Sequence, residues 1–280
     1  MSLEVMLVVL AGAALHAAWN ALVKSGSDPL LDTVLISAGV AAASAVMLIF
    51  VPSPNPSSWP FLAASAAVHL LYFGFMTLAY RGSELSVIYP IMRGSSPAFT
   101  VIAAALLLHE QTTWNGWVGV FLVSGGIWLL AANSPRSKNV RLAPVCFALL
   151  NAGVIMGYSL IDGVGVRRSG NAFSYTAWVL MIGGSVFSLM MTVFDRKRML
   201  EYVLQRWKKG VFGGGCTLAS YSLALWAMTK APIGPVAALR ETSIVFSALL
   251  AVVILKEKIS PLRWISIIVV TAGAIAIKGL

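Results

Sequence analysis

Stretches of apolar residues at membrane length, about ten in all, dominate this chain. A bilayer core about 30 Å thick takes roughly 20 apolar residues of helix to cross. Met6–Val23, Leu30–Val51 and Ala172–Phe194 are among the clearest such stretches. Of the 280 residues, 59% are hydrophobic and only 11% are charged, with a mean hydropathy of +0.86. These features predict an all-α integral membrane protein that lies mostly within lipid.

Turns and polar residues between these stretches set the bounds of ten predicted transmembrane helices. The predicted spans are Glu4–Val23, Leu30–Val51, Pro60–Tyr80, Leu85–Leu108, Thr113–Ala132, Leu142–Val164, Phe173–Phe194, Val211–Thr229, Ile233–Leu255 and Pro261–Ile277. From Asp195 to Lys209, basic residues alternate with apolar ones, a pattern typical of an amphipathic helix at the membrane surface. Gly153 and Gly157 are four residues apart in the sixth span and predict a close helix contact.

An internal repeat divides the chain into two halves, residues 1–133 and 134–280. A shift of 147 residues places Arg93 on Arg240, Glu110 on Glu257 and Trp117 on Trp264. Each half contains five predicted spans, an odd number, so the second half would enter the membrane in the opposite orientation. Inverted repeats give transporters two related conformations, with the substrate site near the midplane. The sequence therefore predicts alternating access between two inverted five-helix repeats.

Each half carries a matching turn after its fourth span. The turns read Leu107-Leu108-His109-Glu110 and Ile254-Leu255-Lys256-Glu257. With the five-plus-five arrangement, they make the whole chain resemble the EamA branch of the drug/metabolite transporter superfamily. Pro97 matches a proline that this family often carries in its fourth helix, whereas the equivalent position in the second half is Ile244. The resemblance implies a multi-pass inner (plasma) membrane exporter of amino acids and related metabolites, with aromatic amino-acid exporters as the closest fit.

Charge distribution and missing motifs exclude several other classes of protein. The formal net charge is +10, but the basic residues lie in connections where they meet lipid headgroups, so no nucleic-acid partner is expected. The sequence has no G-x-S-x-G, no H-E-x-x-H and no phosphate-binding loop, so we expect neither an enzyme nor ATP-driven transport by this chain alone. No cofactor or metal ion is expected. The expected partners are a small-molecule substrate and the lipid bilayer, with the chain a monomer or a weak homodimer.

Ionisable residues within the predicted spans are the first candidates for a transport site, because charge inside a membrane is costly and is usually kept for function. Four of them stand out: Arg93, Asp162, Arg240 and Glu241. Arg93 lies about eight residues into the fourth span, and the small residues Gly94, Ser95 and Ser96 beside it leave room for a ligand. We therefore expect Arg93, ahead of Arg240, to hold a substrate carboxylate through a bidentate contact. Asp162 lies near the end of its span, where it could simply reach the interface.

Polar and aromatic residues away from the span ends form the second set of candidates. Trp19, Asn20, Tyr72, Tyr158 and Tyr221 would contact the ammonium group and an apolar or aromatic side chain of an amino acid. Packing within the bundle is the alternative role for each of them. For Glu110 and Glu257 we expect an architectural role, capping the turns into the fifth and tenth spans.

Several alternatives stay open at this point. A rival substrate class is amphipathic cations or drugs, which need a buried carboxylate in an aromatic site; Glu241 would supply it. Other metabolites, such as sugars, and a non-transporting membrane sensor or enzyme are more remote. Orientation is also open. Lys and Arg outside the spans divide 14 to 4 in favour of the connections after odd-numbered spans, which places the termini outside, whereas the family resemblance places them in the cytoplasm.

Overall fold

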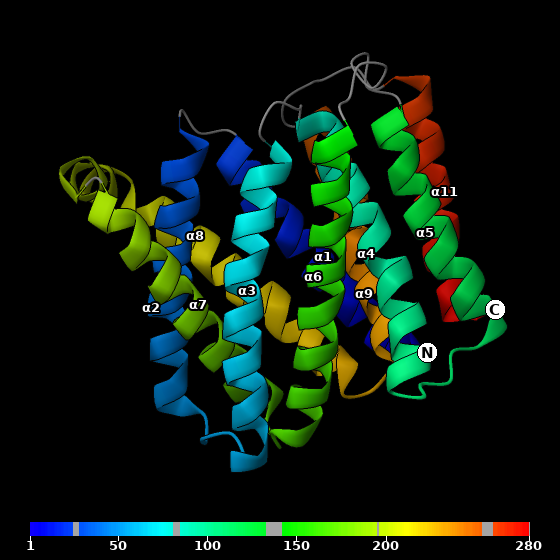
Figure 1. Ribbon diagram of the computed structural model, residues 1–280, viewed down its shortest axis with the longest axis horizontal. Coiled ribbons are helices and arrows are strands. Elements are labelled where there is room, and N and C mark those ends of the chain that lie inside the picture. Colours follow the sequence, from blue (N-terminus) through cyan, green and yellow to red (C-terminus); the bar gives the residue numbers. More distant parts are fainter. Residues whose placement is uncertain (25–27, 81–84, 133–141, 195, 254–259, 280) are drawn as a thin grey trace.

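The computed structural model describes residues 1–24, 28–80, 85–132, 142–194, 196–253 and 260–279. Every regular element in these residues is a helix, and the long helices form one bundle (Figure 1). The helices are α1 (Leu3–Lys24), α2 (Pro29–Phe50), the short 3-10 helix η1 (Pro56–Ser58), α3 (Trp59–Tyr80), α4 (Leu85–Leu107), α5 (Trp114–Ala132), α6 (Leu142–Arg168), α7 (Ala172–Phe194), α8 (Arg196–Met228), α9 (Ile233–Glu241), α10 (Ser243–Val253) and α11 (Pro261–Lys278).

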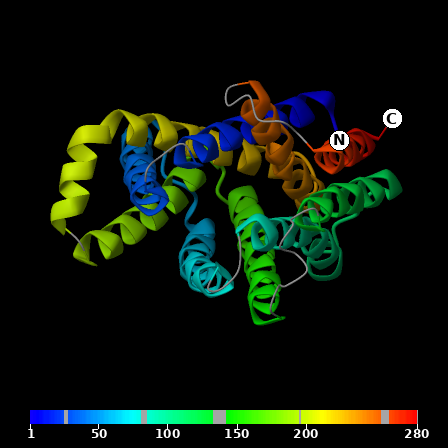
Figure 2. The ribbon, with the colours of Figure 1, turned by 90° about the horizontal axis from the view of Figure 1, so that it is seen from above.

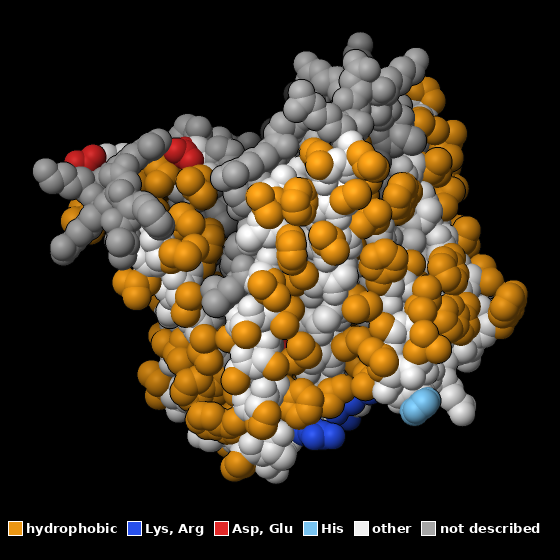
Figure 3. Space-filling model, in the orientation of Figure 1, with side chains coloured by type: hydrophobic (Ala, Val, Ile, Leu, Met, Phe, Trp, Pro, Cys, Tyr) orange, Lys and Arg blue, Asp and Glu red, His pale blue; other side chains and the backbone are white. Residues whose placement is uncertain are grey.

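The outer surface of the bundle is apolar. Among the described residues, eight helical segments have the length and hydropathy to cross a membrane, and a further apolar one, Trp114–Leu130, is shorter. Figure 3 shows hydrophobic side chains spread over the face that it presents. Leu106 and Trp114 are 70% and 79% exposed, as expected for side chains that face lipid rather than water. The prediction of an all-helical, multi-pass membrane protein is confirmed, while the count of ten spans and the inverted repeat stay predictions.

The predicted ninth span, Ile233–Leu255, is not one continuous helix in the structure. It is divided into α9 and α10 at Thr242, whose backbone N–H and hydroxyl both bond back to the carbonyl of Leu239. The hydroxyl bond is 2.6 Å long and competes with the regular helical ladder. The break leaves Arg240 and Glu241 at the carboxyl end of α9, in the middle of the predicted span.

The predicted amphipathic segment is helical and joins the next span. Residues Arg196–Met228 form α8, with one non-helical residue, Arg206, at a kink (φ −126°, ψ 17°). Leu200, Leu204 and Trp207 lie on one exposed face of the segment, and Lys208 is also exposed. This arrangement fits a helix at the boundary between acyl chains and headgroups.

Helix packing brings the two halves of the chain together. In Figure 2, α2, α7 and α8 gather at one end of the bundle and α5 packs on α11 at the other, with α4 and α9 between them. α1 packs on α8, and α3 packs on α6. Glycines bring the backbones close where α5 meets α11: a Cβ at Gly273 would lie 2.8 Å from the carbonyl oxygen of Gly119.

The close contact predicted at Gly153 and Gly157 is not found within the described part of the chain. A Cβ at Gly153 would have no atom within 4 Å, and one at Gly157 would meet Val68 at 3.9 Å, an ordinary contact. Tight glycine contacts are found instead between α5 and α11 and between α2 and α8, where Gly39 faces Gly214. A glycine spacing within one helix cannot indicate which face meets a neighbour, and that limit explains the wrong prediction.

Candidate functional site

A buried ion pair joins the two halves of the chain at the centre of the bundle. Arg93 Nε on α4 lies 2.8 Å from Glu241 Oε2 at the end of α9, and the two side chains are only 6% and 2% exposed. Arg93 Cζ also lies 6.0 Å from the ring centre of Tyr89. Two opposite charges this far from water compensate each other, and removal of either would leave the other unpaired.

The second arginine of the repeat has different surroundings. Arg240 is buried, and its guanidinium has no acidic partner in the described part of the chain. Its Nη2 donates a long hydrogen bond of 3.4 Å to the hydroxyl of Tyr158, and its Cζ lies 5.5 Å from the ring centre of Tyr221. Its Nε has no hydrogen-bond partner among the described residues. Arg240 therefore combines a buried charge with unused donor capacity.

A third charged group lies next to these aromatic residues. Asp162 on α6 is fully buried; its Oδ1 accepts a hydrogen bond of 3.0 Å from the Tyr175 hydroxyl. Its Oδ2 accepts one of 2.5 Å from the hydroxyl of Tyr221. The expectation that Asp162 could reach the interface is wrong, because α6 continues to Arg168, beyond the predicted end at Val164. The extra turn keeps Asp162 inside the bundle, between α7 and α8.

Aromatic and imidazole groups connect these charges. The His69 ring on α3 stacks on the Tyr158 ring with centres 4.5 Å apart, and Tyr72 meets the same ring edge-on at 6.3 Å. On α1, His16 Nε2 lies 3.5 Å from Arg93 Nη2. The indole N–H of Trp19 donates to His16 Nδ1 at 3.2 Å. His16 therefore links Trp19 to Arg93, the arginine of the ion pair with Glu241.

Most of the residues predicted for the site therefore come together, although some predicted roles change. Arg93, Glu241, Arg240, Tyr72, Tyr158, Tyr221 and, through His16, Trp19 belong to one group of contacting side chains. The Asn20 amide instead donates to the carbonyl of His16 on its own helix, at 2.8 Å. Sequence reasoning undervalued Asp162 and Tyr175; the signal that could have found them was one carboxylate inside an otherwise apolar span.

The two loop glutamates were expected to cap α5 and α11. Glu110 Oε2 instead accepts a hydrogen bond of 2.8 Å from the backbone N–H of Ile233, the first residue of α9. Glu110 therefore caps a helix of the other half of the chain, where its negative charge also suits the positive end of the helix dipole. Glu257 lies outside the described residues.

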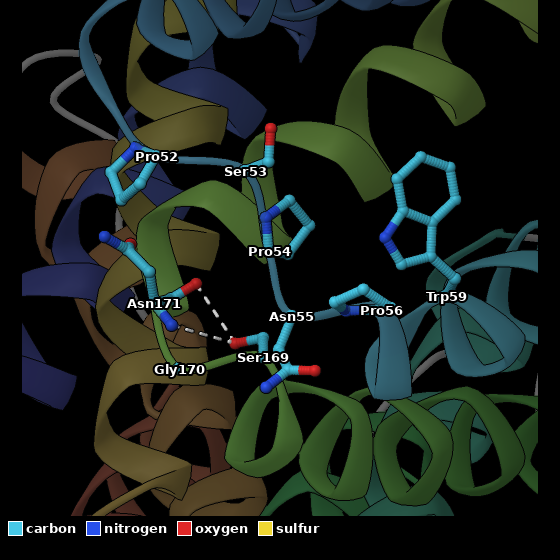
Figure 4. A pocket seen from close by; sticks show the side chains of 9 residues that line it. All are labelled: Pro52, Ser53, Pro54, Asn55, Pro56, Trp59, Ser169, Gly170 and Asn171. Carbon is cyan, nitrogen blue, oxygen red and sulfur yellow. Dashed lines mark hydrogen bonds between the residues drawn. The ribbon is translucent and has the colours of Figure 1, made fainter.

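A separate hollow lies at one end of the bundle, away from the charged centre. It is lined by Pro52–Pro56 and Trp59 on one side and by the α6–α7 turn, Ser169–Asn171, on the other (Figure 4). The Ser169 hydroxyl bonds to the carbonyl of Asn171 at 3.1 Å, and Asn171 Oδ1 caps α7. Its lining carries no charged side chain, so the hollow lacks the groups that would select a charged substrate.

A comparison with protein families agrees with the all-helical membrane fold. The sequence matches the model of the EamA-like transporter family over residues 3–132 and 143–278. The chain belongs to this family. The protein is therefore a membrane transporter by family, and the resemblance seen in the sequence is confirmed at that level.

Individual relatives of this EamA protein cover it to different extents. An uncharacterized transporter, YwfM of Bacillus subtilis (strain 168), is 26% identical over 228 residues, which cover 79% of this chain and 74% of the relative. The spermidine export protein MdtI of Yersinia pestis (strain Pestoides F) is 33% identical over 58 residues, 21% of this chain and 53% of MdtI. A protein of known crystal structure shares the fold, with a TM-score of 0.70 at 15% identity over 98% of this chain and 94% of its own.

Proposed function

We propose that this protein exports small zwitterionic metabolites, most of all amino acids with hydrophobic or aromatic side chains, across the inner membrane. The observation that carries this proposal is the buried guanidinium of Arg240, which has no acidic partner in the described residues and keeps a free Nε. A carboxylate is the group that best fills a planar guanidinium fork. Tyr158, Tyr221 and Tyr72 around it offer an apolar and aromatic surface for the rest of the substrate.

Arg240, rather than Arg93, is the arginine that we assign to the substrate carboxylate. Sequence alone favoured Arg93 because of the small residues beside it. The 2.8 Å contact between Arg93 and Glu241 supports a structural role for Arg93. A guanidinium that already pairs with one buried carboxylate gains less free energy from binding a second one. Gly94 also leaves no space for a ligand, because a Cβ there would lie 2.8 Å from the Trp128 ring.

Alternating access between residues 1–133 and 134–280 is part of the same proposal. Counting α9 and α10 as one span gives ten spans in two halves. The 147-residue shift exchanges α1 with α6 and α3 with α8, so the packing of α1 on α8 has its counterpart in that of α6 on α3. The contacts of α2 with α7, α4 with α9 and α5 with α11 each join equivalent helices. Such pairing supports two inverted repeats related by a pseudo-two-fold axis.

Counterflow into liposomes tests the proposed function. Purified protein, reconstituted without nucleotide and preloaded with unlabelled leucine or phenylalanine, should accumulate the same amino acid in labelled form. Arg240→Gln should abolish accumulation, and Lys208→Gln, which removes an exposed charge, should leave it unchanged. If no amino acid exchanges faster than in protein-free liposomes, the proposal is wrong, and strict ATP dependence would also contradict it.

Export of cationic amines is the second candidate, favoured by the partial similarity to the spermidine exporter MdtI. A polycation would need several carboxylates that can reach it. Glu241 is paired with Arg93, and both oxygens of Asp162 accept hydrogen bonds from tyrosines, so the described centre offers little free negative charge. Including spermidine among the counterflow substrates separates the two candidates.

A further inference from the structure

We infer that Asp162 determines substrate specificity, by balancing the charge of Arg240 so that the centre accepts substrates of zero net charge. This inference rests on the proposed function and concerns how the same site selects its substrate class. Its basis is the arrangement of the four buried charges near the centre of the bundle, apart from Asp32 on α2; two of the four, Arg93 and Glu241, already form a pair. Arg240 and Asp162 are the remaining two, one positive and one negative.

Tyr221 contacts both Arg240 and Asp162, which do not form an ion pair with each other. Its ring lies under the guanidinium of Arg240 at 5.5 Å, while its hydroxyl donates to Asp162 Oδ2 at 2.5 Å. The second oxygen of Asp162 accepts from Tyr175, so two O–H donors solvate a carboxylate that has no direct contact with Arg240. Asp162 therefore compensates the positive charge of the site and leaves the guanidinium of Arg240 available for a ligand.

Two histidines, His16 and His69, also lie close to these charged side chains. His16 Nδ1 accepts the indole N–H of Trp19, and this nitrogen would carry a proton in a charged imidazolium, so the contact describes a neutral ring. His69 Nδ1 lies 2.8 Å from the carbonyl oxygen of Ser65, to which it can only donate.

A centre whose buried charges sum to zero favours a substrate whose own charges sum to zero. Uncompensated charge is expensive to bury, and the cost rises when a ligand adds to an existing excess. An amino acid brings one carboxylate and one ammonium group and leaves the sum at zero. A carboxylic acid without the amine would add one negative charge, and an amine without the carboxylate would add one positive charge. Each of them should bind less well than the amino acid of the same shape.

Replacing the aspartate separates charge from shape. Asp162→Asn keeps the size of the side chain and an oxygen that can accept from a tyrosine, but it leaves the centre with one excess positive charge. This variant should shift preference toward the anion. Asp162→Glu keeps the charge and changes the shape, so it serves as the matched control and should retain the preference of the wild type.

The test uses three ligands that share the isobutyl side chain of leucine: leucine, its 2-oxo acid (4-methyl-2-oxopentanoate) and isopentylamine. Each competes against leucine counterflow at about pH 8, with the membrane potential clamped at zero, so that only binding differs. In Asp162→Asn, the inhibition constant of the oxo acid relative to leucine should fall by about tenfold, which corresponds to about 1.4 kcal/mol. An unchanged ratio, or an equal shift in Asp162→Glu, would overturn the inference. Wild-type protein that exchanges no amino acid would instead refute the proposed function.

A double variant covers the case in which Asp162→Asn does not fold. In Asp162→Asn with Arg240→Gln, the sum of buried charges returns to zero, so the folded yield and the thermal midpoint should recover relative to Asp162→Asn alone. If the double variant is no more stable than the single one, the charges of Asp162 and Arg240 do not balance each other and the inference fails.

Discussion

Arg167 Nη1, at the end of α6, lies 2.6 Å from Glu110 Oε1, which belongs to the connection between α4 and α5. Arg167 also donates from Nε to the carbonyl of Met228 at 2.7 Å and from Nη2 to that of Ala231 at 3.0 Å. We call Glu110 and Arg167 the latch, because together they join one half of the chain to the α8–α9 turn of the other. These bonds link the α4–α5 connection to the α8–α9 turn at this end of the bundle.

The position equivalent to Arg167 in the first half of the chain is not an arginine. A shift of 147 residues places Asn20 where Arg167 stands, and the Asn20 amide turns back to the carbonyl of His16. In an inverted repeat, equivalent positions close opposite ends of the transport path. We therefore expect the two ends to be held unequally, with the latched end closed for more of the time.

The first prediction concerns Glu110. Glu110→Gln keeps an oxygen for the Ile233 N–H but removes the ion pair, so it should lower stability by about 1 kcal/mol, a modest value because Arg167 is 35% exposed. The thermal midpoint in detergent measures this loss. Substrate preference in the competition assay should stay the same. Altered preference at an unchanged midpoint would show that Glu110 contacts substrate instead.

The second prediction concerns access to the latched end. Arg167→Asn copies the residue at the equivalent position of the first half and should open this end more often. In a protein without Cys146 and Cys216, a cysteine at buried Ile233 should then react several-fold faster with a membrane-impermeant maleimide. A cysteine at exposed Gln111 is the control and should react at the same rate in both backgrounds. Equal rates at Ile233 would mean that the latch does not hold the end closed.

The positions of the helices were predictable wherever they depend only on how many consecutive residues are apolar. Twenty apolar residues in a row leave few alternatives to a membrane span, which is why most helix bounds agree within a few residues. The break at Thr242 was not predictable, because no proline or glycine marks it and the hydroxyl bond to Leu239 depends on the local backbone. Hydropathy alone does not distinguish such a break from a continuous helix.

The composition of the site was predictable, but its pairing was not. Charged residues inside spans indicated Arg93, Arg240 and Glu241 as candidates, because burial of charge needs a reason, and the structure buries all three side chains. Which arginine pairs with Glu241 depends on how α4 and α9 are rotated relative to each other. The residue pattern within either helix does not determine this rotation. The sequence alone therefore did not predict the ion pair between Arg93 and Glu241.

The third prediction uses this ion pair. Glu241→Gln leaves the guanidinium of Arg93 buried without a counter-charge, which should cost about 3–5 kcal/mol and sharply reduce folded yield. Arg93→Gln combined with Glu241→Gln removes both charges and should recover much of the loss. Fluorescence-detected size exclusion and thermal midpoints of the two variants measure this. If Glu241→Gln is as stable as the wild type, the pair is not a structural element of the bundle.

The fourth prediction concerns the amphipathic part of α8 and its attachment to α2. Asp32, fully buried in the first turn of α2, accepts from Lys209 Nζ on Oδ2 at 2.6 Å and from the Tyr202 hydroxyl on Oδ1 at 2.9 Å. Lys209→Met would leave this carboxylate with one neutral donor and should cost about 2–3 kcal/mol, reduced from the fully buried case because Lys209 is 15% exposed.

The neighbouring lysine offers a matched control, because Lys208 has the same side chain and local charge but is exposed. Lys208→Met should change the thermal midpoint little, while Lys209→Met lowers it by several degrees. Adding Asp32→Asn to Lys209→Met removes the unpaired charge and should restore part of the loss. Equal effects of the two lysine variants would mean that the segment is held by its apolar contacts with lipid and with α2, rather than by the buried aspartate.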